Sequence, residues 1–261
     1  MMGDRTKLEE LDRTLGSLDS VVVAVSGGVD SAVLWHRATH ILGEQALAVI
    51  AVSPSLAVRD LTEARELASE FHARLVELDT DELADERYAK NDGLRCYHCR
   101  RTLFEAMERW AREHGFGALA YGEIADDALD DRPGRRAATE FRVLAPLALA
   151  GFTKEDVREY AREHGITVAE RPASACLASR LPKGSRVTAE ALRTVERAEE
   201  RVRALGFRVL RVRHHGTTAR LELGADELSR ARGLVDELRS SLHEEGFDDL
   251  ELAAYVDPRY R

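Results

Sequence analysis

Short runs rich in β-branched residues alternate with longer helical periods from residue 21 onward, and no other feature of the sequence restricts the fold so strongly. The runs predicted as strands cover residues 21–25, 46–52, 74–78, 118–121 and 166–169, and the segments predicted as helices cover residues 31–42, 61–72, 102–114 and 153–164. This order is typical of a parallel sheet with helices on both faces. We therefore expect residues 1–185 to form a doubly wound α/β domain.

The order of elements changes after Pro182. There the pattern predicts a helix at residues 188–205, strands at 207–213 and 217–223, a helix at 225–244 and a strand at 247–254. His215-Gly216 would form the turn between the first two of these strands. We expect residues 186–261 to form a small α+β domain with this αββαβ order.

Three helix ends carry local signals, which are of two kinds. Thr153 is followed three residues later by Asp156, which is close to a capping box at a helix start. Gly115 and Gly165 stand where a left-handed residue commonly ends a helix. Both signals support the helices predicted at 102–114 and 153–164.

Composition bounds the class of protein. With 44% hydrophobic and 33% charged residues, the 261-residue chain has the profile of a soluble globular protein, and it contains no apolar stretch long enough to span a bilayer. The segment before Val21 carries charges throughout and lacks the apolar run of a secretory signal, so we expect a cytoplasmic protein. The net charge of −9 disfavours a nucleic-acid partner, although Arg95, Arg100 and Arg101 could form a local basic patch.

The first predicted strand is followed by a glycine-containing loop, Ser26-Gly27-Gly28-Val29-Asp30-Ser31, that opens a helix. Backbone N–H groups and the helix dipole converge on an anion at such a place. Glycines let the chain approach a phosphate closely, while the hydroxyls of Ser26 and Ser31 can donate hydrogen bonds to it. We assign Asp30 to Mg²⁺ or to the geometry of the loop. An isolated Gly-Gly pair would indicate only a turn, whereas six residues in this context are more specific.

The loop resembles the PP-loop of the ATP pyrophosphatase family (adenine nucleotide alpha hydrolase-like fold), whose members cleave ATP between the α- and β-phosphates and adenylate a substrate. It lacks the Walker lysine and the GxGxxG spacing, which argues against γ-phosphate transfer and dinucleotide binding. The resemblance implies adenine contacts at Val52 and Ser53 and a close glycine at Gly122. Asp126, with Asp127, could bind Mg²⁺ or belong to a solvated acidic loop.

The chain has three cysteines, Cys96, Cys99 and Cys176, an odd number that argues against a disulfide framework. The CxxC spacing of the first two suits chelation of a soft metal ion or a cluster. Three thiolates leave one iron of a [4Fe-4S] cluster without a protein ligand. A zinc site completed by His98 or another histidine, or three unrelated thiols, remain open.

The run PxxxCLASR around Cys176, together with SGGVDS, ADD…RPG and RVRHHG, resembles the LarE family over nearly the whole chain. These sulfur transferases build the nickel-pincer cofactor of lactate racemase. The resemblance implies that ATP adenylates a carboxylate of a pyridinium dicarboxylate mononucleotide and that sulfur then replaces the adenylate. One branch sacrifices the sulfur of the cysteine matching Cys176; the other, with matches to Cys96 and Cys99 as well, holds a [4Fe-4S] cluster that carries an extra sulfide. All three cysteines are present, which favours the second branch.

Several charged residues complete the candidate site. Arg180 could stabilise the acyl-adenylate or the leaving phosphate, or form only a surface salt bridge. Arg211 and Arg213 share one face of a predicted strand and, as the resemblance implies, could hold the phosphate of the acceptor nucleotide; they could also be solvated. The acidic residues that we consider possible metal or contact residues are Glu199, Glu200 and Glu222.

The resemblance also implies a homo-oligomer and a separate sulfide donor, although the last residues, 253–261, depart from the ending expected of the family.

Two other functions remain open. A PP-loop tRNA thiolase also uses ATP and three cysteines, but the acidic charge and the lack of an RNA-binding module argue against it. A sensing module that binds nucleotide or cluster without turnover would need neither a pyrophosphatase loop nor a third cysteine.

Overall fold

The computed structural model describes residues 2–129, 133–171 and 175–256, and the chain divides into two compact units. The first unit contains Met1–Tyr88 and Gly93–Ser174, and the second contains Ala89–Asp92 and Ala175–Arg261. Residues 175–185 therefore group with the second unit and not, as the sequence suggested, with the first. The reason is side-chain pairing, because Arg180 binds Glu199 (2.8 Å) and Arg213 donates to the carbonyl of Ser179 (2.6 Å).

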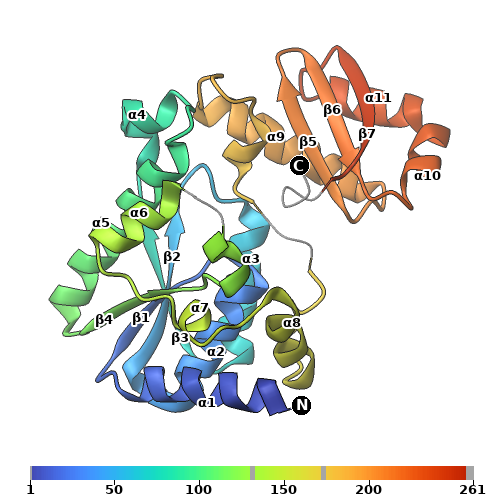
Figure 1. Ribbon diagram of the computed structural model, residues 1–261. Coiled ribbons are helices and arrows are strands. Elements are labelled where there is room, and N and C mark those ends of the chain that lie inside the picture. Colours follow the sequence, from blue (N-terminus) through green and yellow to red (C-terminus); the bar gives the residue numbers. More distant parts are fainter. Residues whose placement is uncertain (1, 130–132, 172–174, 257–261) are drawn as a thin grey trace. The chain divides into compact units, whose positions relative to one another are not determined.

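The first unit is built on a four-stranded sheet in the order β3-β2-β1-β4, and all of its strand pairs are parallel (Figure 1). The strands are β1 (Val21–Ala24), β2 (Ala46–Val52), β3 (Arg74–Asp79) and β4 (Ala118–Tyr121). The α-helices are α1 (Met2–Gly16), α2 (Val29–Leu42), α3 (Val58–Glu70), α4 (Glu86–Ala89), α5 (Arg95–His114), α6 (Pro133–Glu140), α7 (Pro146–Leu149) and α8 (Lys154–Glu163). Short 3₁₀ helices are η1 (Gly43–Gln45), η2 (Glu82–Ala84) and η3 (Ala125–Leu129). The predicted α/β fold with a parallel sheet is confirmed.

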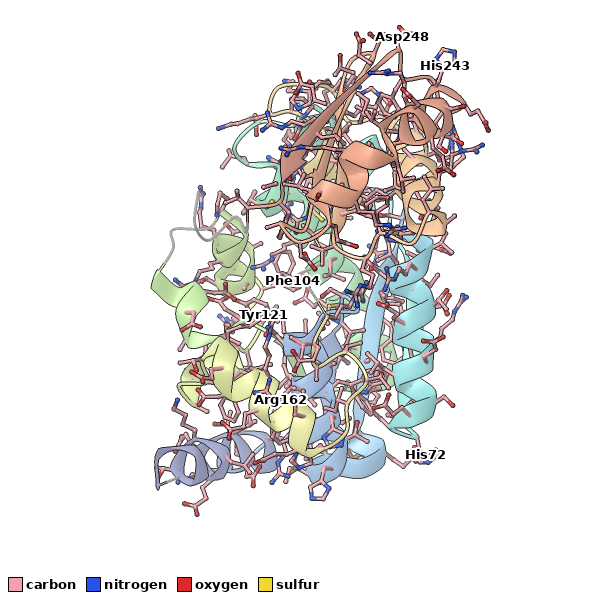
Figure 2. The ribbon with its side chains drawn as sticks, turned by 90° about the vertical axis from the view of Figure 1, so that its right-hand side faces the viewer. His72, Phe104, Tyr121, Arg162, His243 and Asp248 are labelled. Carbon is pink, nitrogen blue, oxygen red and sulfur yellow. The ribbon has the colours of Figure 1, made fainter. Side chains whose placement is uncertain are left out.

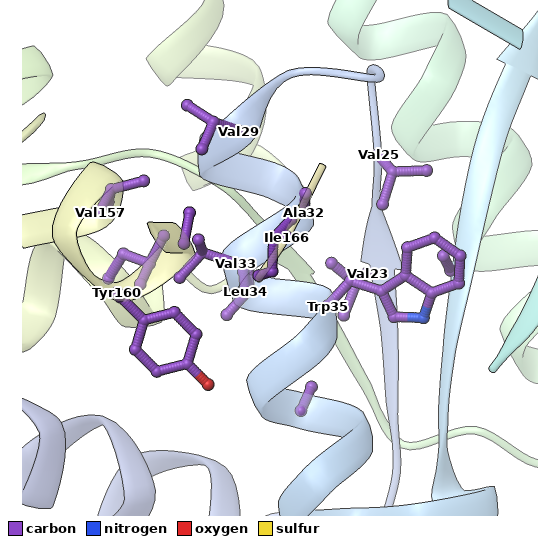
Figure 3. Close-up of a cluster of buried hydrophobic side chains, with 14 of the residues drawn as sticks. Val23, Val25, Val29, Ala32, Val33, Leu34, Trp35, Val157, Tyr160 and Ile166 are labelled. Atoms are coloured by element: carbon purple, nitrogen blue, oxygen red, sulfur yellow. The ribbon is translucent and has the colours of Figure 1, made fainter. Parts of the chain in front are cut away.

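Both faces of this sheet are covered by helices, because β1 and β2 are apolar on both sides. Val21 and Val23 of β1 face one cluster, which includes residues of α1, α2 and α8. Figure 3 shows part of it, with Val23, Trp35 of α2 and Tyr160 of α8. The alternating positions of β1 face a second cluster with α5 and α6.

The second cluster contains the edge-on ring pair of Phe104 in α5 and Tyr121 in β4, with ring centroids 5.9 Å apart (Figure 2). Edge-on packing of aromatic rings is a favoured arrangement. It fixes α5 against the end of β4, and the residue that follows this end is Gly122.

The predicted helix signals are confirmed. The Thr153 side chain accepts from the N–H of Asp156 (3.3 Å), and the Asp156 carboxylate accepts from the N–H of Thr153 (2.6 Å), which completes a capping box. Gly115 ends α5 with φ 76°, and Gly165 has φ 66°. These are the left-handed conformations that glycine adopts without strain.

Two expectations for the first unit are wrong, and a further helix was missed. The run 166–169 forms turns, in which the N–H of Ala169 donates to the carbonyl of Ile166 (3.0 Å), and its apolar side chains enter the core. The helix expected from residue 102 begins at Arg95. Helix α1 was not predicted; its buried Leu11 and Leu15 pack against the α2 side of the sheet.

The second unit contains a three-stranded sheet in the order β5-β6-β7, with β5 and β6 antiparallel and β6 and β7 parallel. Its elements are η4 (Leu177–Arg180), α9 (Ala189–Ala204), β5 (Leu210–His215), β6 (Thr218–Leu223), α10 (Leu228–Gly233), α11 (Val235–His243) and β7 (Asp249–Ala254). The turn between β5 and β6 contains Gly216, with φ 64°, as predicted. The helix predicted at 225–244 is divided in two, because Leu234 leaves the helical conformation (φ −114°, ψ 20°).

Within the described residues, no helix is both long enough and apolar enough to span a lipid bilayer.

Candidate active site

The Ser26–Ser31 loop joins β1 to α2 and has the geometry of an anion site. Gly27 is left-handed (φ 70°), and Gly28 is the N-cap of α2 in an extended conformation without a side-chain cap. The first N–H groups of a helix have no acceptor within the helix, so those of α2 point out of its N-terminus toward a ligand. Ser26 is exposed beside them.

Ser31 stabilises this loop from within. Its hydroxyl donates to the carbonyl of Gly28 (3.1 Å) and accepts from the N–H of Ser26 (3.2 Å). The side chain is buried, with 6% exposed. The hydroxyl proton is therefore engaged within the loop, so in this conformation Ser31 stabilises the loop and does not offer its proton to a ligand.

Asp30 is paired with Lys154, a residue that the sequence analysis missed. The Lys154 ammonium donates to both carboxylate oxygens of Asp30 at 2.8 Å. Burial raises the pKa of Asp30, and Lys154 opposes this effect. Lys154 is the first residue of α8, and its N–H also donates to the carboxylate of Asp126 (2.8 Å). The capping signal at Thr153 places this lysine at a helix start, but only its contacts with Asp30 and Asp126 identify its role.

Gly122, at the end of β4, lies against the start of α2. A Cβ atom there would be 2.6 Å from the nitrogen of Ser31 and 2.9 Å from the carbonyl carbon of Asp30. No side chain fits in this space without displacing the backbone of the loop. The structure therefore brings the predicted Gly122 next to the predicted loop.

Arg171 ties the same loop to α3. Its guanidinium donates to the carbonyl of Gly27 (2.6 Å) and pairs with the carboxylates of Asp60 and Glu63. Because the carbonyl of Gly27 is held on this side, the orientation of the Gly27–Gly28 peptide is constrained. Arg171 was not identified from the sequence, since an arginine before a proline carries no local signal.

The predicted adenine contacts, Val52 and Ser53, lie at the carboxyl end of β2, where both are partly buried. Ser53 donates its hydroxyl proton to Glu82 (2.6 Å). The carboxyl ends of strands are where ligands bind in open α/β sheets. The structure thus places Ser53 at the same edge of the sheet as the Ser26–Ser31 loop.

Cys96 and Cys99 lie at the start of α5, three residues apart on one side of the helix, with Cys96 exposed and Cys99 partly buried. His98 is buried, with 8% exposed, and its ring projects about 100° from Cys99 and about 160° from Cys96 around the helix axis. His98 is therefore poorly placed to complete a zinc site with these thiols. The early start of α5 creates this arrangement.

Cys176 belongs to the second unit and is exposed at the N-terminus of η4. Arg180 holds this turn: its guanidinium donates to the carbonyls of Ala175 and Cys176 and to the hydroxyl of Ser179 (3.1 Å). The same guanidinium forms two hydrogen bonds with Glu199, at 2.8 and 3.2 Å. In this conformation Arg180 positions the backbone of Cys176.

Glu199 is the centre of this network, with 2% exposed. It also accepts from Arg203 (3.0 Å) and from the N–H of Val212 (3.2 Å). Burial alone would raise the pKa of Glu199, but Arg180, Arg203 and this N–H outweigh burial and lower it. Glu199 therefore neutralises arginines. Glu200 pairs with Arg203 (2.7 Å) on the exposed side of α9.

Arg211 and Arg213 project from one face of β5. Arg211 is 4% exposed and lies over the ring of Tyr255 at 4.5 Å, and burial lowers its pKa. Arg213 pairs with Glu222 (2.9 Å) and donates to the carbonyl of Ser179 (2.6 Å). The second unit thus gathers arginines next to the turn that carries Cys176.

Among the residues that the structure describes, no group of three or more His, Cys, Asp or Glu side chains is arranged to hold a metal ion. Mg²⁺ at Asp30 or Asp126 and a cluster on the cysteines therefore stay predictions.

Comparison with known proteins identifies a family for this chain. The family model described as "Thiamine biosynthesis protein (ThiI)" matches residues 16–204. A pyridinium-3,5-bisthiocarboxylic acid mononucleotide synthase of Lactiplantibacillus plantarum is 32% identical over 243 residues, which is 93% of this chain and 88% of that enzyme. This chain belongs to the LarE family. As a LarE family member it is an ATP-dependent sulfurtransferase.

Two other relatives match different shares of the chain. An uncharacterized protein of Synechocystis sp. is 36% identical to this LarE family member over 225 residues, which is 86% of the chain and 84% of the relative. A tRNA-specific 2-thiouridylase MnmA of Azorhizobium caulinodans is 32% identical over 193 residues, but these cover 59% of the chain and 49% of that enzyme.

Proposed function

We propose that this protein uses ATP to adenylate a carboxylate of a pyridinium dicarboxylate mononucleotide and then inserts sulfur to form a thiocarboxylate for a nickel-pincer cofactor. In the first step a carboxylate oxygen attacks the α-phosphorus of ATP and pyrophosphate leaves. In the second, a sulfide attacks the acyl carbon and AMP leaves. The observation that carries the proposal is the 32% identity over 93% of the chain to a synthase of this class of product.

The first unit supplies groups for the adenylation step. The N–H groups at the start of α2 would bind the pyrophosphate, and Gly122 lets the end of β4 pack against the backbone that carries them. The Lys154–Asp30 pair would open when Mg²⁺–ATP binds, since the carboxylate suits Mg²⁺ and the ammonium suits a phosphate oxygen. Asp126, bonded to the N–H of Lys154, is the second candidate ligand of Mg²⁺.

The second unit supplies groups for the acceptor. Arg211 and Arg213 would bind the phosphate of the mononucleotide, and Arg180 would hold the backbone of Cys176. Two glutamates, Glu199 and Glu222, already neutralise part of this positive charge.

The cysteines fit a [4Fe-4S] cluster in their donor chemistry. Cys96 and Cys99 lie one helical turn apart, Cys96 and Cys176 are exposed, and none of the three forms a disulfide in the described structure. We propose that these residues hold the cluster. When bound, it would supply an iron without a protein ligand, which can carry sulfide. The sulfide would come from a separate donor, and the protein would act as a homo-oligomer in the cytoplasm, as the family resemblance implies.

The proposal is tested by anaerobic incubation with ATP, Mg²⁺, sulfide and the pyridinium dicarboxylate mononucleotide, followed by mass spectrometry of the protein and the small molecule. We expect repeated formation of the thiocarboxylate with the protein mass unchanged. Loss of about 34 Da from the protein would instead indicate sacrifice of the Cys176 sulfur. If no thiocarboxylate forms by either route, the proposed function is contradicted.

The Cys176→Ala variant isolates the sulfur step. Because Cys176 lies in the second unit, outside the ATP loop, we expect this variant to bind ATP and release pyrophosphate but to form no thiocarboxylate. Pyrophosphate release serves as the internal control. Sulfur transfer at the wild-type rate would remove Cys176 from the mechanism.

A tRNA thiolase is the second candidate, favoured by the partial identity to tRNA-specific 2-thiouridylases. The net charge of −9 argues against it. Tight tRNA binding that weakens steeply with salt would support this alternative, and no ATP turnover with any acceptor would support a sensing module.

A further inference from the structure

A buried carboxylate that pairs with no basic side chain of the described residues lies at the carboxyl end of the sheet in the first unit. Glu82, in η2, is 3% exposed. It accepts from the hydroxyls of Ser53 (2.6 Å) and Thr80 (3.2 Å), and none of the ion pairs in the described residues includes it. Burial of a carboxylate without a cation is unfavourable. Such a feature needs a reason in the function of this edge of the sheet.

The hydrogen bond from Ser53 to Glu82 fixes the direction of the serine hydroxyl. A hydroxyl has one proton and two acceptor positions. The Ser53 proton is donated to Glu82, and one acceptor position takes the N–H of Ser55 (3.2 Å). Ser53 is only partly buried, so its remaining acceptor position is available to a ligand. Ser53 can therefore receive a hydrogen bond but cannot donate one.

The nucleoside of a bound ATP would extend toward this serine. The phosphate loop follows β1, and β2 is the neighbouring strand on one side of β1 while β4 is on the other. On the β4 side, the backbone of Gly122 lies directly against Ser31, and a Cβ atom would be 2.6 Å away. The carboxyl end of β2, which carries Ser53, lies next to that of β1, because these two strands pair in parallel.

We propose that Glu82 sets the choice of nucleotide: it holds the proton of Ser53, so Ser53 Oγ accepts from the exocyclic amino group of adenine. Guanine has a carbonyl oxygen at that ring position, and two acceptors facing each other cannot form a hydrogen bond. Glu82 is then a positioning residue for base selection. The inference rests on the proposed use of ATP, and it concerns the nucleotide alone.

The test measures equilibrium binding of nucleotides to the full chain by calorimetry, without acceptor. For the wild type we expect ATP to bind about tenfold more tightly than GTP and than purine riboside triphosphate, which lacks the amino group. In Glu82→Gln, the new amide can donate to Ser53 and release its proton, so GTP binding strengthens and the preference falls to about twofold. Ser53→Ala should weaken ATP about tenfold and leave purine riboside triphosphate unchanged.

Matched controls separate this role from a structural one. Glu77→Gln makes the same substitution on the exposed side of β3, where Glu77 pairs with Arg65 (2.7 Å), and should keep the wild-type preference. A Glu82→Gln protein that melts like the wild type but keeps its full preference for ATP over GTP overturns the inference. So does a loss of affinity for 2′-deoxy-ATP with normal binding of purine riboside triphosphate, because the donor would then be the ribose.

The experiments distinguish a failure of base selection by Glu82 from a failure of the proposed sulfur transfer. If the preference responds to Glu82 but no thiocarboxylate forms, base selection stands and the proposed acceptor is wrong. If thiocarboxylate forms and Glu82→Gln has no effect on the preference, only base selection is wrong. No binding of ATP by the wild type contradicts both.

Discussion

A single methyl group can decide whether the phosphate loop keeps its shape. At Gly122 a Cβ atom would lie 2.6 Å from the nitrogen of Ser31 and 2.7 Å from its Cα, and both neighbours are backbone atoms that cannot rotate away. At Gly117, just before the same strand, the nearest atom is the Ser20 hydroxyl at 3.8 Å, an ordinary contact. The two glycines therefore differ in what surrounds them and not in their chemistry.

We expect Gly122→Ala to weaken ATP binding by on the order of tenfold or more, because the start of α2 must move to accommodate the methyl group. Gly117→Ala is the matched control and should bind ATP normally. Calorimetric titration of both variants with ATP checks this. Equal affinities would show that the contact between Gly122 and Ser31 has no part in nucleotide binding.

At the scale of elements, two helix starts position the candidate site. The start of α5 places Cys96 and Cys99 on one side of this helix, and the start of α8 places Lys154 next to Asp30. The second start depends on its capping box. Burial would raise the pKa of Asp156, but Lys7 and the Thr153 hydroxyl outweigh burial and lower it.

Removal of this cap should destabilise the protein in a pH-dependent manner. Thr153→Ala should lower the free energy of unfolding by about 1 kcal/mol at neutral pH. Because the folded-state pKa of Asp156 is lowered, its contribution is present above the unfolded pKa of about 4 and is lost as pH falls below it. Asp156→Asn should therefore reduce the loss of stability in acid.

Urea denaturation across this pH range measures both effects. Thr62→Ala is the matched control, because Thr62 bonds the carbonyl of Val58 (3.0 Å) within α3 and caps no helix. Its unfolding free energy should stay within about 0.5 kcal/mol of the wild type. An equal loss in Thr153→Ala and Thr62→Ala would contradict a special role of the cap.

At the scale of the whole molecule, the cysteines are divided between the two units. Cys96 and Cys99 belong to the first and Cys176 to the second. A cluster bound by all three thiolates would therefore link the folding of the units, since a metal that binds only the folded state stabilises it.

Anaerobic reconstitution should load about four irons per chain and raise the melting temperature by about 5 °C, with both units unfolding in one calorimetric transition. In Cys176→Ala, the iron content should fall and the transition should stay where it is in the iron-free protein. Zinc in place of iron, or a melting curve that does not respond to loading, would contradict the assigned cluster.

Much of the fold could be predicted because several strands are continuous apolar runs, and the predicted bounds of β2 and β4 are the observed ones. The run 166–169 has the same appearance, yet it forms turns, since a short apolar run cannot distinguish a strand from another buried segment. The first two turns of α5 were missed because Arg95–Arg101 has no apolar period, and helix α1 was missed because its charged exposed positions hide a narrow buried face.

The candidate site divides in the same way. Sequence alone determined the features that are local in the chain: the glycine loop after β1, the cap at Thr153 and the three thiols. Only the tertiary structure decided their partners, because Lys154 meets Asp30 across 124 residues and Arg171 meets Gly27 across 144. Local conformation follows from neighbouring side chains, whereas the pairing of distant charges depends on how the core packs, and no short stretch of sequence contains that information.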